Sequence, residues 1–293
     1  MIKHLSEKLQ LSERSIQNTI ELLDEGCTIP FIARYRKERT GSLDEVQIAA
    51  ISDLATKWRE MEKRKDTIRK TITEQGKMTP ELEKRIAECD NAETLEDIYL
   101  PFKPKRRTKA QVAREQGLEP LATLIMLGRE QRPEEAAKRF VKGEVKSAAD
   151  AIQGAQYIIA ETVSEDERSR HTVRRQFERD AIITSKVVKT KADTEEAAKY
   201  KDYFDWQEPL RRCPSHRMLA MRRGEAEGIL RVSISTDDEE CIERLKRNNV
   251  RCQGRCATLY REAVEDSYKR LLQPSIENEF ASNSKEKAEE EAI

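Results

Sequence analysis

A chain of 293 residues is long enough for two domains or for one extended helical assembly. Its 55 lysines and arginines balance 55 aspartates and glutamates, which excludes a globally basic protein and requires any basic surface to be local. Charged residues make up 38% of the chain and aromatic residues only 5%, yet apolar residues recur at helical spacing, so helices with ion-paired faces are favoured over disorder.

The sequence has no segment typical of membrane or secreted proteins. No apolar run reaches the roughly 20 residues that span a bilayer, and residues 1–15 lack the apolar core of a signal peptide. Six cysteines without an export signal are typical of reduced thiols, which predicts a cytoplasmic protein with no membrane association.

The first predicted helix is capped by Ser12 and ends at Gly26. Pro30 then predicts a turn or an extended segment. Ser42 and Glu45 form a possible S-x-x-E capping box for a long helix over residues ~43–74.

An apolar seam with one charged interruption follows that long helix at 3-4 spacing, formed by Ile51, Leu54, Trp58, Met61, Lys65, Ile68 and Ile72. At 1.5 Å per residue the helix would be about 48 Å long, so we predict a spine. Its seam packs either against helices of the same chain, which about three heptads favour, or against a second chain as a coiled coil.

Shorter helices are predicted after the spine. Thr79 and Pro80 are typical of an N-cap and a first helical residue, and Thr94 with Asp97 begins another helix.

Residues 117–190 are predicted to form a compact module of short helices. Ser147 with Asp150 can cap one helix, and Ser164 with Glu167 can cap the next. Two helices around a tight turn at 163–165 suit a helix-turn-helix. The predicted organisation is a discontinuous scaffold, residues 1–116 and 191–293, with a nested helix-turn-helix-like module at 117–190.

Two segments have strand character. Residues 182–188 are rich in β-branched side chains, and residues 229–235 alternate with period two. They predict at most one short β-hairpin in an otherwise all-α, elongated fold. The last long helix should end at Pro274, and residues 284–293 begin a new helical pattern without a stop signal, as in a truncated chain or the lead-in to a further domain.

An apolar knuckle, residues 29–33, runs directly into a cluster of cations. We assign Pro30, Arg34, Arg36 and Arg39 to a structural motif in which Arg34 or Arg36 is partly buried and bonds carboxylates of neighbouring helices, because a guanidinium binds a carboxylate through two N–H groups. Phosphate binding is the alternative.

The segment "PFKPKRRTKA" has five cations and no acid, and its two prolines keep it out of a helix. We predict non-sequence-specific contacts to a nucleic-acid backbone from Lys103, Lys105, Arg106, Arg107 and Lys109. The alternative is a solvated loop, or salt bridges to acidic helices.

The predicted helix "ERSRHTVRRQFERD" carries Arg170 and Arg174 on one face, with Arg168 and Arg175 nearby. As the second helix of a helix-turn-helix it could approach nucleic acid through Arg170 and Arg174. The interleaved acids favour instead a solvated charged face or a protein interface.

No catalytic, metal or cofactor site is predicted. Cys213, His216, Cys252 and Cys256 could supply zinc ligands, but the C-x3-C spacing is not that of a usual zinc knuckle. The three histidines lack a neighbouring nucleophile, and no glycine-rich phosphate loop is present. We therefore expect no enzymatic activity.

Four long motifs carry a family resemblance across nearly the whole chain: "GCTIPFIARYRKERTGSLDE", "LEDIYLPFKPKRRTKAQVAREQGLEPLA", "YFDWQEPLRRCPSHRMLAMRRGEAEGIL" and "RLLQPSIENEF". In this order they resemble the N-terminal region of the Tex family of bacterial transcription accessory proteins. Ser215, His216 and Arg217 lie in the third motif and are assigned to the structural set. The resemblance implies a helical region with a helix-turn-helix-like insert, ahead of YqgF, helix-hairpin-helix and S1 domains, with much of the nucleic-acid binding in the S1 domain.

These observations predict a non-catalytic, monomeric scaffold in transcription regulation. It would position downstream modules and add weak, non-sequence-specific RNA or DNA contacts. The alternative is a protein-interaction module that contacts RNA polymerase, the ribosome or related machinery without touching nucleic acid.

Overall fold

The computed structural model describes residues 1–292. These residues form two compact units, and the boundary along the chain lies between Lys103 and Pro104. From the sequence, boundaries were expected at 116/117 and 190/191. Residues on both sides of position 190 share one core, for example Ile158 and Val264. That residues 117–190 form a module of their own stays a prediction.

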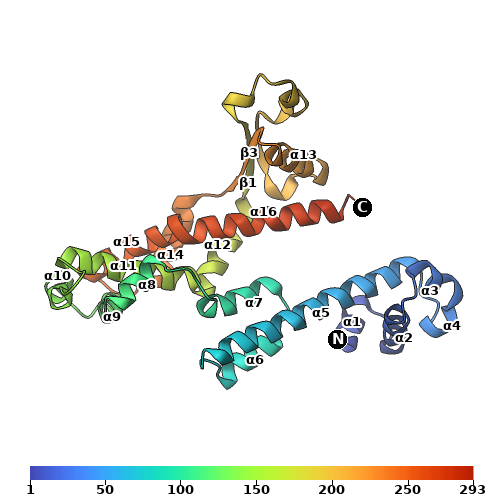
Figure 1. Cartoon of the computed structure of the whole chain (residues 1–293), viewed down its shortest axis with the longest axis horizontal. Coiled ribbons are helices and arrows are strands. Elements are labelled where there is room, and N and C mark those ends of the chain that lie inside the picture. The colour runs from blue at the N-terminus through green and yellow to red at the C-terminus, as the bar shows by residue number, and fades with distance from the viewer. Residues whose placement is uncertain (293) are drawn as a thin grey trace. The chain divides into compact units, whose positions relative to one another are not determined.

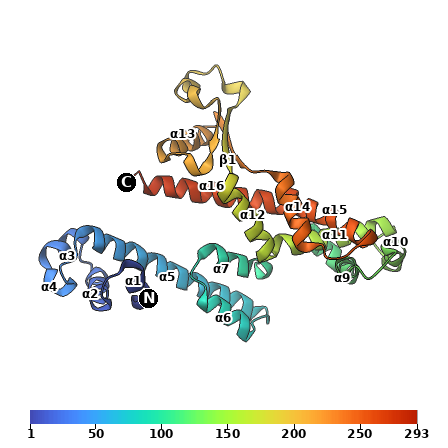
Figure 2. The ribbon, with the colours of Figure 1, turned by 180° about the vertical axis from the view of Figure 1, so that it is seen from behind.

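The first unit is helical throughout (Figure 1). Its elements are α1 (Ile2–Leu9), α2 (Glu13–Asp24), α3 (Ile29–Tyr35), α4 (Lys37–Thr40), α5 (Glu45–Glu74), α6 (Pro80–Glu88), α7 (Ala92–Tyr99) and the 3-10 turn η1 (Leu100–Phe102). Figure 2 shows α1–α4 gathered at one end of α5, with α6 and α7 along its other half.

The predicted spine is confirmed as α5, a helix of 30 residues. The apolar seam of α5 contributes side chains to two separate hydrophobic cores of the first unit. Ile48 and Ile51 pack with α1–α3, whereas Ile68 and Ile72 pack with α6 and α7. Between the two cores, Lys65 is only 3% exposed and donates to Glu62 Oε1 at 2.9 Å and to the Ala87 carbonyl at 3.1 Å.

Several local predictions in this unit need correction. Pro30 does not break the chain but lies in the first turn of α3, where its missing N–H costs nothing. The capping box of α5 is Asp44 with Gln47, because Ser42 adopts a left-handed φ of 63° and cannot be the cap. Helix α7 is capped by Asn91 rather than begun at Thr94.

The second unit combines helices with one small sheet. Its elements in chain order are α8 (Lys109–Glu115), α9 (Glu119–Leu127), α10 (Pro133–Ala137), η2 (Lys138–Phe140), α11 (Ala148–Glu165), α12 (Glu167–Asp180), β1 (Ile182–Val187), η3 (Lys189–Lys191), η4 (Glu195–Tyr203), β2 (Asp205–Pro209), η5 (Leu210–Arg212), α13 (Ser215–Ala226), β3 (Leu230–Ser235), α14 (Asp238–Asn249), α15 (Gly254–Ser267), the π turn η6 (Tyr268–Leu272) and α16 (Gln273–Glu290).

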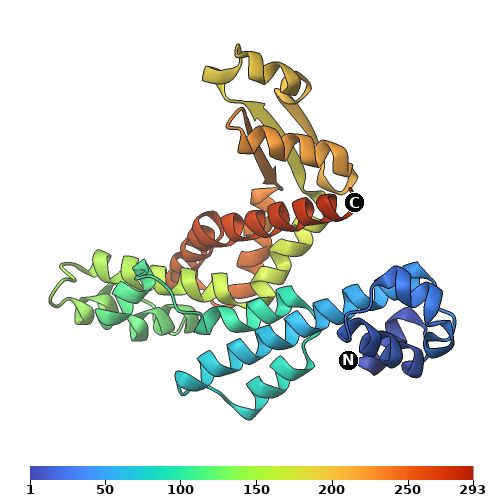
Figure 3. The ribbon, with the colours of Figure 1, turned by 45° about the vertical axis from the view of Figure 1, so that its right-hand side comes forward.

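The predicted strands do pair, antiparallel, with Ile182 opposite Ser235 and Val187 opposite Leu230. The prediction of at most a hairpin was one strand short, because β2 pairs with the other edge of β1 and gives the order β2-β1-β3. One face of the sheet buries Ile183 and Ile234 in the core near α13 (Figure 3). The alternate side chains face solvent.

Pro274 does not end the last helix, as the sequence suggested. α15, η6 and α16 run without interruption from Gly254 to Glu290. The π turn just before Pro274 shifts the bonding pattern to i−5, which accommodates a residue that cannot donate an i−4 bond.

Helix capping in the α11–α12 region also differs in part from the sequence prediction. Ser147 caps α11 as predicted, but α12 is capped by Asp166, whose carboxylate accepts from the Ser169 N–H at 2.8 Å. Ser164 instead donates to the Glu161 carbonyl within α11. None of the helices between residues 1 and 292 is long and apolar enough to cross a membrane.

Candidate phosphate-binding groove

The cations of the knuckle lie at the surface of the first unit. Arg34 is exposed and 3.9 Å from Glu45, and Arg36 lies over the Phe31 ring at 5.0 Å. Glu45 belongs to α5, and Arg39, on α4, reaches a further helix at 3.5 Å from Glu21 of α2. The predicted pairing with a carboxylate of a neighbouring helix is present for Arg34, although its side chain is 70% exposed rather than partly buried.

The basic segment after Pro104 is partly neutralised by its own unit. Lys105 forms ion pairs with Glu161 and Glu165 of α11, and Arg107 pairs with Glu115 at 2.9 Å. Lys109 lies over the Tyr157 ring at 4.9 Å. Arg106 and Lys109 are the cations of this segment that are exposed and form no ion pair within residues 1–292. Lys103, at the end of the first unit, is likewise exposed.

Glu161 explains why this segment lies on α11. Its carboxylate accepts from Thr108 Oγ1 at 2.8 Å, Arg114 Nη1 at 3.0 Å and Lys105 Nζ at 3.2 Å. Burial alone would raise the pKa of Glu161, but the hydrogen bonds from Thr108, Arg114 and Lys105 outweigh it and hold the pKa below its ordinary value of 4.5. The alternative reading, salt bridges to acidic helices, thus describes Lys105 and Arg107.

Arg170 and Arg174 lie inside the protein, which corrects both their proposed role in nucleic-acid contact and the solvated-face alternative. Arg174 bonds the Glu279 carboxylate of α16, and Arg170 bonds Ser275 Oγ at 3.3 Å. Both arginines are 7% exposed. The reason is their position on the side of α12 that also carries the buried Val173 and Phe177.

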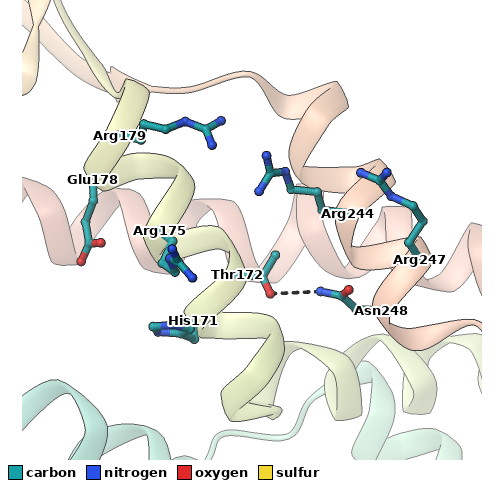
Figure 4. A pocket seen from close by; sticks show the side chains of 8 residues that line it. All are labelled: His171, Thr172, Arg175, Glu178, Arg179, Arg244, Arg247 and Asn248. Carbon is teal, nitrogen blue, oxygen red and sulfur yellow. Dashed lines mark hydrogen bonds between the residues drawn. The ribbon is translucent and has the colours of Figure 1, made fainter.

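The opposite side of α12 faces α14 and forms an open groove of about 670 Å³. Figure 4 shows the side chains that line it from both helices. The lining residues are His171, Thr172, Arg175, Glu178 and Arg179 from α12, and Arg244, Arg247 and Asn248 from α14. Four of the lining residues are arginines and one, Glu178, is acidic. Glu178 lies on the side of α12 that points away from α14 (Figure 4).

Polar bonds between the two helices hold the groove in shape. Asn248 Nδ2 donates to Thr172 Oγ1 at 3.2 Å in the groove floor, and Asn249 Nδ2 donates to Ser169 Oγ at 3.2 Å beneath it. At one end, Gln176 Nε2 donates to Glu240 at 3.1 Å. These bonds fix the spacing of the arginines on both walls.

The four arginines differ in how they are compensated. Arg179 and Arg244 both bond Glu240, and the hydrogen bond from Arg244 is the main reason why the pKa of Glu240 lies below its ordinary value. Arg175 and Arg247 have no carboxylate partner anywhere in the described residues 1–292. The groove therefore keeps two uncompensated guanidinium groups, whose planar N–H forks match phosphate oxygens.

The zinc alternative fails on geometry. No three histidine, cysteine, aspartate or glutamate side chains among the described residues are placed to hold a metal ion. Cys256 donates to the Glu130 carbonyl at 3.1 Å, and burial, followed by the contact with Glu208, raises the pKa of Cys213 to about 12.

The "PSHR" segment has a structural role in the second unit. Arg217 bonds the Glu208 carboxylate of β2 at 2.8 and 3.0 Å and lies over Trp206 at 5.4 Å. Ser215 bonds Glu291, and His216 is exposed. These contacts join the start of α13 to β2 and to the end of the chain.

The sequence pattern indicated Arg170 and Arg174 of α12, whereas the groove is lined by Arg175 and Arg179 on the opposite side of that helix. Arg175 was noted only as a neighbour of Arg174, and Arg244 and Arg247 were not considered. Their i, i+3 spacing places them on one helix face, but nothing local shows that α14 lies beside α12.

The fold and this site define a mostly helical protein with a small antiparallel sheet and an arginine-lined groove. Residues 1–73 match the family model described as Tex-like protein N-terminal domain, and residues 128–293 match Tex central region-like. The chain belongs to the Tex family, as its motifs indicated.

Relatives in bacteria and animals share this region. The chain is 39% identical over 297 residues to Transcriptional accessory protein Tex of Neisseria gonorrhoeae, covering 99% of this chain and 39% of that protein. It is 40% identical over 302 residues to Protein YhgF of Escherichia coli, with 99% and 39% covered. Identity to S1 RNA-binding domain-containing protein 1 of Homo sapiens is 27% over 308 residues, with 100% and 31% covered. The chain thus spans about two fifths of the length of its bacterial relatives.

Proposed function

We propose that this chain is the non-catalytic scaffold of a transcription accessory protein and that it contacts a nucleic-acid backbone through the α12–α14 groove. The observation that carries the proposal is the pair Arg175 and Arg247, which face one groove from two helices and have no carboxylate partner within residues 1–292. Arginines without a carboxylate partner in a groove suit phosphate, because a guanidinium can bind phosphate oxygens through two parallel N–H bonds.

The chemistry of the groove supports backbone contact rather than base reading. Arginine forks and the polar Thr172 and Asn248 can bind phosphate and sugar oxygens, which carry no sequence information. Contacts of this kind are weak, salt-dependent and common to RNA and DNA. Arg106, Lys109 and Lys103 are exposed cations that could add to the same weak attraction.

Names of relatives agree with this role. One relative is named for transcription and another for an S1 RNA-binding domain. We propose that the present chain positions such modules, acts in the cytoplasm, where its six free thiols would stay reduced, and works as a monomer. The monomer is supported by the α5 seam, which its own helices cover.

A binding experiment tests the groove. Fluorescence anisotropy with labelled 20-nucleotide RNA, single-stranded DNA and duplex DNA, in 50 and 200 mM salt, should show weak binding that 200 mM salt removes. Arg175→Glu with Arg247→Glu should lower the affinity at least tenfold at 50 mM salt. Arg139→Glu with Arg261→Glu, two exposed arginines outside the groove, makes the same charge change and should have a much smaller effect. Equal losses in both variants would contradict a built site.

The basic segment is best tested through Arg106 alone. Substituting Lys105 or Arg107 would also break their pairs with Glu161, Glu165 and Glu115, so lost binding could reflect lost structure. Arg106→Glu changes the charge without removing an ion pair in the described chain, and we expect at most a threefold loss of affinity.

One observation favours the protein-interaction function as a second candidate. Phe31, Tyr35 and Val46 of the first unit are 37%, 64% and 78% exposed, and the Phe31 and Tyr35 rings lie 5.3 Å apart. Exposed aromatic side chains beside arginines are typical of interface anchors. Phe31→Ser with Tyr35→Ser should then weaken binding to purified RNA polymerase or ribosomes in a pull-down, while nucleic-acid affinity stays unchanged.

A further inference from the structure

A second cavity lies on the solvent-facing side of β1 and β3 and shares no residue with the α12–α14 groove. Its volume is about 610 Å³. The polar residues that line it are Thr184, Lys186, Lys189, Thr190, Arg231 and Ser233. Three are cations and three carry hydroxyl groups, and no carboxylate of the described chain lines the cavity.

Two of these cations are direct partners across the sheet. Lys186 is opposite Arg231 in the β1–β3 register, and directly opposed side chains lie on one face with Cβ atoms roughly 5 Å apart. The register of β2 places Asp205 on the other side of Lys186. Even so, neither Lys186 nor Arg231 forms an ion pair with any residue between 1 and 292.

An unneutralised pair of like charges opposes the stability of a sheet. Functional sites can keep side chains that lower stability, and this pair is such an arrangement on an open face of the sheet. Thr184 and Ser233 are also opposed in the ladder and, two residues along each strand, lie on the same face as the cation pair. The face therefore offers two cations and two hydroxyl donors side by side.

We propose that this open face of β1 and β3 binds the phosphodiester backbone of a nucleic-acid strand. Charge complementarity selects this occupant, because arginine and lysine beside hydroxyl donors bind phosphate oxygens and the cavity holds no acid to compete for them. The inference rests on the proposed function and deepens it, since it adds a second backbone contact on a different element of the same unit.

Lysine acetylation read by mass spectrometry tests the site directly. The full chain is acetylated with and without a saturating 20-nucleotide RNA, saturation being checked by anisotropy. Lys186 should react at least threefold more slowly when RNA is bound, whereas Lys142, exposed on another part of the same unit, should not change. An unchanged Lys186 under saturated RNA would overturn this inference and leave the proposed function standing.

Two further results would also decide against the site. Absence of any RNA or DNA binding at 50 mM salt would remove the proposed function and this inference with it. Protection of Lys186 by pyrophosphate but not by RNA would replace the backbone with a free phosphate ligand.

A double variant separates binding from structure. Lys186→Ala with Arg231→Ala should lower RNA affinity at least threefold while the Tm stays unchanged or rises, because the like-charge repulsion is gone. Arg139→Ala with Lys142→Ala removes the same two kinds of charge elsewhere and should leave both values unchanged. A lowered Tm with unchanged affinity would make the pair structural.

Discussion

Arg174 on α12 binds the carboxylate of Glu279 on α16 through two hydrogen bonds, Nε to Oε1 at 2.6 Å and Nη2 to Oε2 at 3.1 Å. The side chains of Arg174 and Glu279 are only 8% and 17% exposed. Arg170, one turn earlier, lies 3.7 Å from the same carboxylate. The Glu279 carboxylate therefore lies beside two buried guanidinium groups and ties α12 to α16.

We predict that Glu279→Ala destabilises the second unit more than Arg174→Ala does. Removing one partner of a buried ion pair costs about 3–5 kcal/mol because the other charge is left buried and unpaired. Loss of Glu279 removes the carboxylate that both Arg170 and Arg174 approach, whereas loss of Arg174 leaves a carboxylate that Arg170 still approaches. Urea unfolding followed by circular dichroism measures both. Glu286→Ala, on the exposed side of α16, is the control and should change the free energy of unfolding by less than about 0.5 kcal/mol.

Glu161 should make the second unit sensitive to acid. Its pKa is below 4.5 in the folded protein, so its contribution to stability is fully present above about pH 4.5 and is lost as the pH falls through the lowered pKa. Glu161→Gln should thus be most destabilising at neutral pH, and its difference from the wild type should shrink below pH 4.5. Thermal unfolding between pH 3 and 7 measures this difference, and one that does not vary with pH would contradict the role of Glu161.

We predict that the first unit does not need the charge of the buried Lys65 for stability. Both of its partners can be hydrated when it is removed, because Glu62 is 41% exposed and Ala87 is also at the surface. Lys65→Met keeps the length of the side chain and completes the apolar seam, so we expect a Tm that is unchanged or higher. Lys65→Ala should lower the Tm, because the packing of the aliphatic stem is lost. Lys70→Met, on the exposed side of α5, is the matched control.

The salt dependence of binding should report the number of phosphates that the groove neutralises. Arg175→Ala with Arg247→Ala should reduce the slope of log affinity against log salt by about 1.4 on single-stranded RNA and about 1.8 on duplex DNA, two released counterions in each case. A titration between 50 and 200 mM salt measures the slope. A lowered affinity with an unchanged slope would mean that the two arginines act without contacting phosphate.

Short-range rules explain which predictions from the sequence were confirmed. The bounds of α5, the caps at Ser12, Thr79 and Ser147, and the stop at Gly26 depend on residues within about four positions of each other. The caps of α5 and α12 were each missed by two residues, because several neighbouring side chains could accept a backbone N–H at the helix start. The four long sequence motifs were sufficient to identify the Tex family.

Side-chain environment was much harder to predict. Arg174 and Arg175 are adjacent in the sequence, yet one is buried against Glu279, 105 residues away, and the other lines a groove with Arg247. Likewise Lys105 looked free until the structure placed Glu161 beside it, 56 residues along the chain. No local pattern distinguishes the buried Arg174 from the groove-lining Arg175, because the two residues have the same charge and the same helix propensity.

The sequence by itself determined the helix that forms the spine, the caps at Ser12, Thr79 and Ser147, and the family to which the chain belongs. Only the tertiary structure decided which arginines are neutralised, that β2 joins the sheet, and that Lys186 stands opposite Arg231. The physical reason is range: backbone hydrogen bonds and apolar periodicity act over a few residues, whereas the compensation of a charge depends on whichever carboxylate the completed fold brings within about 4 Å.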